Sequence, residues 1–172
     1  RTTYRYGAGR LLSIQDALGR QTSFAYDAAG HMLSHTNALS QTTAWAYDAW
    51  GHLVTITDAL GYTMTWTYDA HQNPIRYTDP RGQRWGFTYD EQHNLIQDID
   101  PLAHTTVYTY DEQGQLTQVR DPAGFEVMYT YDAHGNLTGV IDATGAQTAY
   151  DYDANDGLIR ITDANGHTTA YQ

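Results

Sequence analysis

The dyad Tyr-Asp returns every 21 residues along this chain without a change of phase. It stands at seven places, which are Tyr26-Asp27, Tyr47-Asp48, Tyr68-Asp69, Tyr89-Asp90, Tyr110-Asp111, Tyr131-Asp132 and Tyr152-Asp153. A fixed period of this length is typical of repeat architectures, in which each unit packs mainly on its neighbours. The chain is therefore expected to consist of one small element used many times.

Three further positions recur with the same period of 21 residues, and each set of equivalent positions is called a column. An Asp or Asn recurs ten residues before each dyad Tyr, three residues later comes a small residue, and eight residues later comes an aromatic one. The columns are Asp16, Asn37, Asp58, Asp79, Asp100, Asp121, Asp142 and Asp163; Gly19, Ser40, Gly61, Gly82, Ala103, Gly124, Gly145 and Gly166; and Phe24, Trp45, Trp66, Phe87, Tyr108, Tyr129, Tyr150 and Tyr171.

Each unit reads as two strands and two turns. Around "TAWAY", residues 43–47, the aromatics alternate with small or polar residues, which predicts a half-buried strand. Asp caps turns and Gly supplies positive φ, so "DAWG" and "DALG" predict turns. The second strand starts six residues after the dyad Tyr, as at Leu53, and it carries apolar residues on both faces by strict alternation. The fold class predicted is therefore all-β, a repetitive antiparallel hairpin meander without helices.

Two units depart from the consensus. Residues 6–16 are one residue short and have Gly7 in place of the dyad Asp. The unit that starts at Asp90 loses both turn glycines, to His93 and Ala103, and has Asp98 where most units have Val or Ile. Local geometry is expected to differ at both places.

Composition excludes several classes of protein. The net charge is −11 and the pI about 4.8, which disfavours nucleic acid and anionic membrane surfaces as partners. Fourteen of the aspartates belong to the two turn columns, so turn chemistry accounts for the acidity. Cysteine is absent, and no apolar run approaches the ~20 residues of a membrane span. Neither end shows a signal peptide, and both ends fall inside the repeat, which indicates a segment of a longer protein.

The strand count predicts curvature. Seven full units with their flanks give about sixteen strands, and a twisted sheet of more than ~10 strands curls or closes. Because every unit turns by the same angle, the array of residues 1–172, about eight units of 21 residues, is expected to form a spiral sheet. Cross-strand aromatic pairs, at about 0.2–1 kcal/mol each, would then replace a compact core.

The unit in "YTYDAHGNLTGVIDATGAQTAYDYD", residues 129–153, resembles the YD repeat of the RHS family, and the resemblance covers essentially the whole chain. It implies a segment of a β-cocoon shell, as in bacterial Rhs polymorphic toxins and toxin-complex shells. In that family the shell encapsulates a C-terminal toxin for delivery to target cells. The implied partners are neighbouring repeats, the toxin polypeptide and a secretion apparatus, with a secreted location and a role in virulence. Periodicity leaves open which face lines the cavity.

The resemblance also directs attention to an aspartyl self-cleavage motif. Residues 74–83, "PIRYTDPRGQ", match the family's P-x4-D-P-x-G-L form except for the final Leu. Asp79 lies in the ordinary turn column, so a repeat turn is the preferred interpretation. Because every acidic column is repeated, no residue stands out as catalytic, and the segment is expected not to be an enzyme. No cofactor is expected.

Metal sites are not predicted. The eight histidines, His31, His35, His52, His71, His93, His104, His134 and His167, read as surface turn residues. The nine-residue glycine-rich pattern of calcium-binding β-rolls is absent.

A second class of function remains open. Aromatic hairpin repeats of similar length also form carbohydrate- and choline-binding modules of cell-surface proteins. In such modules aromatic side chains from adjacent hairpins converge on a ligand. Trp45 and Trp66 stand alone in their predicted strands, which favours the shell over this alternative.

Overall fold

The computed structural model describes residues 1–171, and these form an all-β structure of antiparallel strands with no helix. This confirms the predicted fold class. The strands are β1 (Thr3–Gly7), β2 (Arg10–Gln15), β3 (Gln21–Tyr26), β4 (Met32–Thr36), β5 (Thr42–Tyr47), β6 (Leu53–Thr57), β7 (Thr63–Tyr68), β8 (Pro74–Thr78), β9 (Arg84–Tyr89), β10 (Leu95–Ile99), β11 (Thr105–Tyr110), β12 (Leu116–Arg120), β13 (Glu126–Tyr131), β14 (Leu137–Ile141), β15 (Gln147–Tyr152), β16 (Leu158–Thr162) and β17 (Thr168–Ala170).

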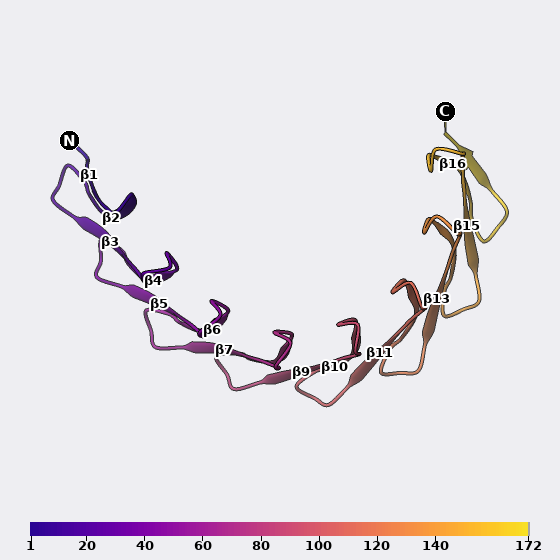
Figure 1. Cartoon of the computed structure of the whole chain (residues 1–172), viewed down its shortest axis with the longest axis horizontal. Coiled ribbons are helices and arrows are strands. Elements are labelled where there is room, and N and C mark those ends of the chain that lie inside the picture. The colour runs from indigo at the N-terminus through magenta and orange to yellow at the C-terminus, as the bar shows by residue number, and fades with distance from the viewer. Residues whose placement is uncertain (172) are drawn as a thin grey trace. The chain divides into compact units, whose positions relative to one another are not determined.

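The chain divides into two compact units, Arg1–Trp85 and Gly86–Gln172. Within each unit every strand pairs with the strand before it and the strand after it, so the topology is a meander. Figure 1 shows the hairpins of each unit following one another side by side in an open, single layer. The winding of a longer array into a spiral stays a prediction.

Both kinds of turn have the same geometry. In the turn at Asp58, the carbonyl of Asp58 accepts from the Gly61 amide and the Asp58 amide donates to the Tyr62 carbonyl. The Asp58 side chain caps the turn by accepting from the amides of Leu60 and Tyr62, both at 2.9 Å. Gly61 has a φ of 86°, so the loop is a three-residue turn that ends in the left-handed region.

The unit that lacks the two turn glycines keeps this geometry. His93 and Ala103 take φ values of 67° and 64°, and their amides donate to the Asp90 and Asp100 carbonyls as in the glycine turns. The expected difference at these two turns is therefore wrong, because aspartate capping holds the turn even where a side chain costs strain. Repeat one does differ: Ala8 and Gly9 both have positive φ, a two-residue turn between Gly7 and Arg10.

A β-bulge in the second strand of each hairpin sets which residues share a face. Tyr47 lies opposite Leu53 and Trp45 lies opposite Ile56, although Leu53 and Ile56 are an odd number of residues apart. The register shift at Val54 between them absorbs the extra residue. Both apolar side chains therefore join the aromatic face, which resolves the apolar pattern that strict alternation placed on two faces.

Neither face of the layer is covered. Among residues 1–171, no hydrophobic or polar side chain is fully buried. Most aromatic and aliphatic strand residues are half-buried by their neighbours on the same face, as the burial of the residues in β5 and β6 illustrates. Cohesion must therefore come from the hydrogen-bonded ladder and from contacts between adjacent hairpins.

Neighbouring aromatic rings illustrate these contacts in the first unit. Tyr77 lies between Trp66 and Trp85, with ring centroids 5.1 Å and 5.2 Å away. Trp66 is the single tryptophan of β7, and the bulge in β8 places Tyr77 opposite it, which is a cross-strand aromatic pair of the predicted kind. His35 lies in β4 with its ring 5.2 Å from that of Phe24 in a tilted arrangement, so it is a strand residue and not a turn residue.

We expect Gly61→Ala to lower the free energy of unfolding by about 1 kcal/mol, because L-residues disfavour positive φ. No atom lies within 4 Å of the position that a Cβ on Gly61 would occupy, so backbone strain is the only cost. Urea unfolding followed by circular dichroism measures the loss.

The reciprocal change Ala103→Gly is the control for Gly61→Ala. Its backbone already has a φ of 64°, so glycine relieves strain there and stability is expected to stay equal or to rise slightly. Equal losses in the two variants would contradict the assignment of strain to this turn position.

Candidate functional site: the seam of Tyr-Asp turns

The repeat signature lies in one row of turns, each directly after a dyad. We call this row the seam, and we call the residue four positions after each dyad Asp the seam residue. The seam residues are His31, His52, Asn73, Asn94, Gln115, Asn136 and Gly157, and Arg10 takes this place in the shorter first hairpin.

The dyad aspartates cap the seam turns. Asp48 Oδ1 accepts from the amides of Trp50 and His52, both at 2.9 Å. Its Oδ2 accepts from the side chain of the seam residue, His52 Nδ1, at 3.0 Å. Asn94 and Asn136 make the same contact with their own dyad aspartates at 3.0 Å and 3.1 Å. Both carboxylate oxygens of the aspartate thus take part in capping the turn.

The dyad tyrosines tie each hairpin to the one before it. Tyr68 donates its hydroxyl to the Leu53 carbonyl at 2.8 Å, fifteen residues earlier. Tyr110, Tyr131 and Tyr152 repeat this bond to Leu95, Leu116 and Leu137 at 2.9–3.0 Å. The accepting carbonyl directly precedes the bulged residue, where the ladder is interrupted. Tyrosine therefore satisfies a backbone group that phenylalanine would leave without this partner.

Seam residues also pack on the tyrosine of the next repeat. His31 stacks on Tyr47 with ring centroids 4.8 Å apart, and His52 lies over Tyr68 at 4.9 Å. Arg10 lies over the Tyr26 ring at 5.9 Å and donates to the Asp27 carbonyl at 3.0 Å. The next turn glycine makes room for these side chains, since a Cβ on Gly51 would sit 3.1 Å from His31.

Hydrogen bonding shifts the pKa values of seam groups. The His31 side chain lowers the pKa of Asp27, and the Asn136 side chain lowers the pKa of Asp132. Burial of the ring raises the pKa of Tyr68 and of Tyr131. The lowered aspartate pKa values thus have the same physical cause as the turn geometry, the hydrogen bonds that the carboxylates accept.

Some polar contacts between strands or turns fall outside the repeat pattern, and Asp156 and Asp98 make two of them. Asp156 accepts from Asn136 Nδ2 and is bonded to His134 Nδ1, both at 2.8 Å, which links consecutive seam turns. This contact raises the pKa of His134. Asp98 accepts from the Tyr108 hydroxyl at 2.6 Å and raises the pKa of Tyr108 to about 12. Only Asp98 was visible in the sequence as an exception, since it replaces an apolar residue.

The structure places all seven predicted dyads at the seam, in the same position of successive hairpins. The contacts of the seam residues and the target of the tyrosine hydroxyls were not predicted. The contacts of the seam residues could have been anticipated from one signal in the sequence, a polar residue that recurs four positions after most dyad aspartates. These residues are His31, His52, Asn73, Asn94, Gln115 and Asn136.

The remaining candidates from the sequence lie in ordinary repeat turns. Asp79 Oδ1 accepts from the amides of Arg81 and Gln83, both at 2.8 Å, as the other turn aspartates do. His104 and His167 bond the aspartates four residues before them. Within residues 1–171 no three His, Asp or Glu side chains are grouped to hold a metal ion, and no helix there is long and apolar enough to cross a membrane.

Solved structures share this fold. The chain is similar to the crystal structure of TcdB2-TccC3-TEV, with 17% identity over 94% of this chain and 10% of that one, and a TM-score of 0.70. It is similar to a mutant Photorhabdus luminescens Tc holotoxin pore and to TcdB2-TccC3, with TM-scores of 0.61 and 0.63. In both comparisons the identity is 19% over 94% of this chain and 12% of the other. The chain spans about a tenth of the length of these structures. A search of curated proteins found no match.

Antiparallel hairpins repeated in tandem and tied by Tyr-Asp turns define a β-hairpin repeat protein. The family described as RHS Repeat matches residues 6–42, 26–63, 47–84, 68–105, 95–126 and 131–168. The chain therefore belongs to the RHS repeat family, as the Tyr-Asp pattern predicted.

We expect Tyr68→Phe to lower the free energy of unfolding by about 1 kcal/mol, because the Leu53 carbonyl loses its partner. Tyr26→Phe is the matched control, since within residues 1–171 the Tyr26 hydroxyl makes no hydrogen bond and its ring keeps the Arg10 contact. Urea unfolding of both variants distinguishes them, and equal losses would show that the hydroxyl bond contributes nothing.

The capping aspartates predict acid sensitivity. A folded-state pKa below the ordinary 3.8 means that the stabilisation is fully present above that value and is lost as the pH falls through the lower folded value. We therefore expect the Tm to fall between about pH 4 and pH 2. His134 acts in the opposite sense: its contribution is complete below 6.5 and disappears as the pH rises through its raised pKa.

The variant Asp132→Asn separates turn capping from general acid denaturation. The amide oxygen can still accept from the turn amides but carries no charge, so the fall in Tm on acidification should become smaller. A Tm that stays constant between these pH values in the unmodified chain would contradict the role assigned to the carboxylates.

Proposed function

We propose that this segment is part of the wall of a toxin-associated RHS shell, and that the shell encapsulates a toxin polypeptide for delivery to target cells. Membership of the RHS repeat family supports this proposal. The likeness of the fold to structures that contain TccC3, with TM-scores up to 0.70, is the observation that carries it.

The physical properties of the segment suit a wall. It is a single hydrogen-bonded layer, and among residues 1–171 it has no buried core that closes it into a globule. A β-ladder leaves no gap that a polypeptide could pass between paired strands, since neighbouring strands lie only about 4.8 Å apart. Seam contacts and bulges repeat at each hairpin, so the wall can be extended by adding units.

The same properties support a non-enzymatic role. Every seam aspartate is engaged by turn amides, and equivalent groups recur in each repeat, which leaves no single nucleophile or acid–base pair set apart. The proposed partners are neighbouring repeats, the enclosed polypeptide and a secretion apparatus, and the proposed location is outside the producing bacterial cell.

A protease-protection experiment tests the wall function. In the natural protein that carries these repeats, Thr65→Pro should break the ladder, because Thr65 pairs with both Thr55 and Thr78 in the centre of the sheet. We expect the enclosed polypeptide to be resistant to trypsin in the unmodified protein and to be digested in this variant.

Ala59→Pro is the matched control for Thr65→Pro. Residue 59 follows the turn Asp58, and Pro80, Pro101 and Pro122 stand at the same column of other repeats, so proline is tolerated there. Digestion of the cargo at the same rate in the unmodified protein and in both variants would argue against a protective wall.

A further inference from the structure

The turns opposite the seam carry a row of exposed leucines in the first unit. Leu18, Leu39 and Leu60 each stand two residues after the capping residue of their turn, and they are 79%, 75% and 78% exposed. Figure 1 shows the turns before β3, β5 and β7 following one another along the same edge of this unit. We call these three residues the leucine row. Exposed leucines scattered singly over a surface are ordinary, but leucines aligned in register at one edge are not.

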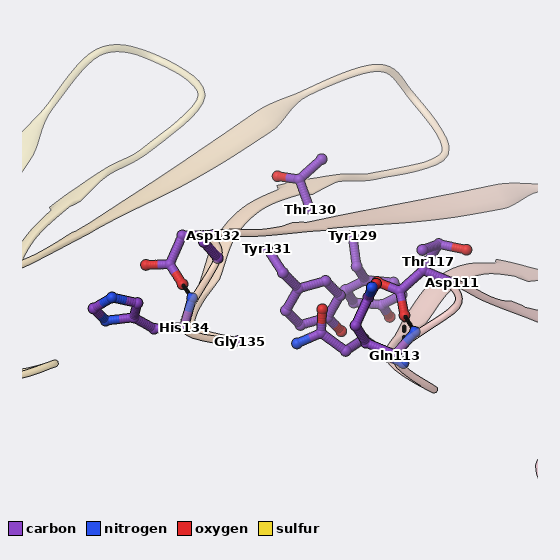
Figure 2. Close-up of a pocket in the computed structure, with 11 residues that line it drawn as sticks. Asp111, Gln113, Thr117, Tyr129, Thr130, Tyr131, Asp132, His134 and Gly135 are labelled. Atoms are coloured by element: carbon purple, nitrogen blue, oxygen red, sulfur yellow. Dashed lines mark hydrogen bonds between the residues drawn. The ribbon is translucent and has the colours of Figure 1, made fainter.

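Turn geometry alone does not require leucine at this position. The seam turns have the same geometry, and Figure 2 shows the capping bond of one, from the His134 amide to Asp132, at 2.9 Å. Of the seven seam turns only one, at Trp50, has a large apolar residue at its tip. In the second unit the position of the leucines is held by Leu102, Ala123, Thr144 and Asn165. The leucine row is therefore a property of one edge of the first unit.

The shape of the row limits what can cover it. Neighbouring tips are two strands apart, about 9.6 Å, and each presents one leucine, with Tyr62 also exposed in the turn of Leu60. By itself such a single file exposes less surface than the roughly 800 Å² that each partner buries in a standard protein interface. A lipid surface adapts to a narrow ridge, and binding to it scales with the apolar area inserted.

The backbone of these turns suits an apolar environment. The amides of Leu18, Leu39 and Leu60 donate to the side chains that cap their turns at 2.8 Å, 2.9 Å and 2.9 Å. An amide that enters the apolar part of a bilayer without a partner is costly. The caps therefore let the leucine tips leave water without exposing these donors.

The charges around the row favour a lipid surface with no net charge. Arg20 pairs with the capping Asp16 at 2.6 Å, and the next cap, Asn37, is uncharged. Residues 1–85 carry seven arginines and six acidic side chains, whereas residues 86–172 carry two and fourteen. The first unit is thus nearly neutral, and the net charge of −11 on the whole chain opposes binding to anionic lipid. Tyrosine and arginine, as at Tyr62 and Arg20, are side chains suited to the membrane–water interface.

We propose that the leucine row docks on a zwitterionic lipid surface, with Leu18, Leu39 and Leu60 inserted among the lipid headgroups. The row would hold one edge of the wall against a membrane without crossing it. This role is additional to that of a wall and does not depend on whether the wall encloses a toxin.

Vesicle flotation of the whole 172-residue chain tests the proposal. The probes are vesicles of phosphatidylcholine and vesicles of phosphatidylcholine and phosphatidylserine in equal parts. We expect the chain to float with the phosphatidylcholine vesicles and to bind the anionic vesicles more weakly, because the chain is acidic.

The decisive variant combines Leu18→Gln, Leu39→Gln and Leu60→Gln. We expect it to partition into phosphatidylcholine vesicles about tenfold or more weakly. Its Tm should be kept, because glutamine stands at the tips of seam turns of the same geometry, as at Gln113. Trp50→Gln is the matched control, since Trp50 is a 73% exposed apolar tip of the same unit on the other row of turns, and it should bind as the unmodified chain does.

A fluorescent label locates the contact. The chain contains no cysteine, so Leu39→Cys supplies a single thiol for a polarity-sensitive fluorophore. We expect its emission to shift to shorter wavelength when phosphatidylcholine vesicles are added, and the same label on Trp50→Cys to show no shift.

Four results would overturn the proposal. These are no flotation of the unmodified chain, stronger binding to the anionic vesicles, equal binding by the triple variant and Trp50→Gln, or an emission shift of the Leu39→Cys label that grows with protein concentration in the absence of lipid. The last result would assign the leucine row to contact between copies of this chain.

Discussion

This protein depends on contacts between adjacent hairpins, because a single uncovered layer has no interior to bury side chains in. Among the described residues no apolar side chain is fully buried, so each one contributes only part of its apolar surface to the hydrophobic stabilisation. The dyad tyrosine and aspartate hold the hairpins in a fixed arrangement, which a buried core does in a globular protein. The aspartate fixes the turn from within, and the tyrosine bonds a backbone carbonyl of the preceding hairpin. The 21-residue phase is strict because a slip of one residue would turn each side chain to the opposite face.

The bulge explains how apolar residues an odd number of positions apart can share one face of the sheet. It lets Leu53 and Ile56 lie on the same face as Tyr47 and Trp45, and it leaves the carbonyl that Tyr68 satisfies. The bulge, the tyrosine hydrogen bond and the positive-φ turn residue thus act together to fix the register of each hairpin. The turn keeps its geometry even where glycine is absent, since Ala103 adopts a positive φ in the turn that Asp100 caps.

Local sequence patterns predicted most of the fold. Alternation predicted the strands, Asp and Gly predicted the turns, and the period predicted that the dyads are equivalent. Contacts that need three-dimensional register were not predictable. His35 was predicted to be a surface turn residue like the other histidines, because no residue type announces the bulge in β4 that brings His35 opposite Phe24. The link from Asp156 to His134 joins two turns whose spacing depends on the register of the intervening strands.

A wall made of equal units can still vary from place to place at the seam residue, which touches the next tyrosine without altering the ladder. The central claim is that a 21-residue hairpin is a self-contained unit that needs only its neighbours. Hydrogen exchange on two excision variants tests it most directly. Removal of residues 111–131 keeps the phase and should leave the remaining strands of the second unit as protected as before. Removal of residues 112–131 shifts the phase by one and should abolish protection nearby. Equal loss of protection in both variants would contradict the claim.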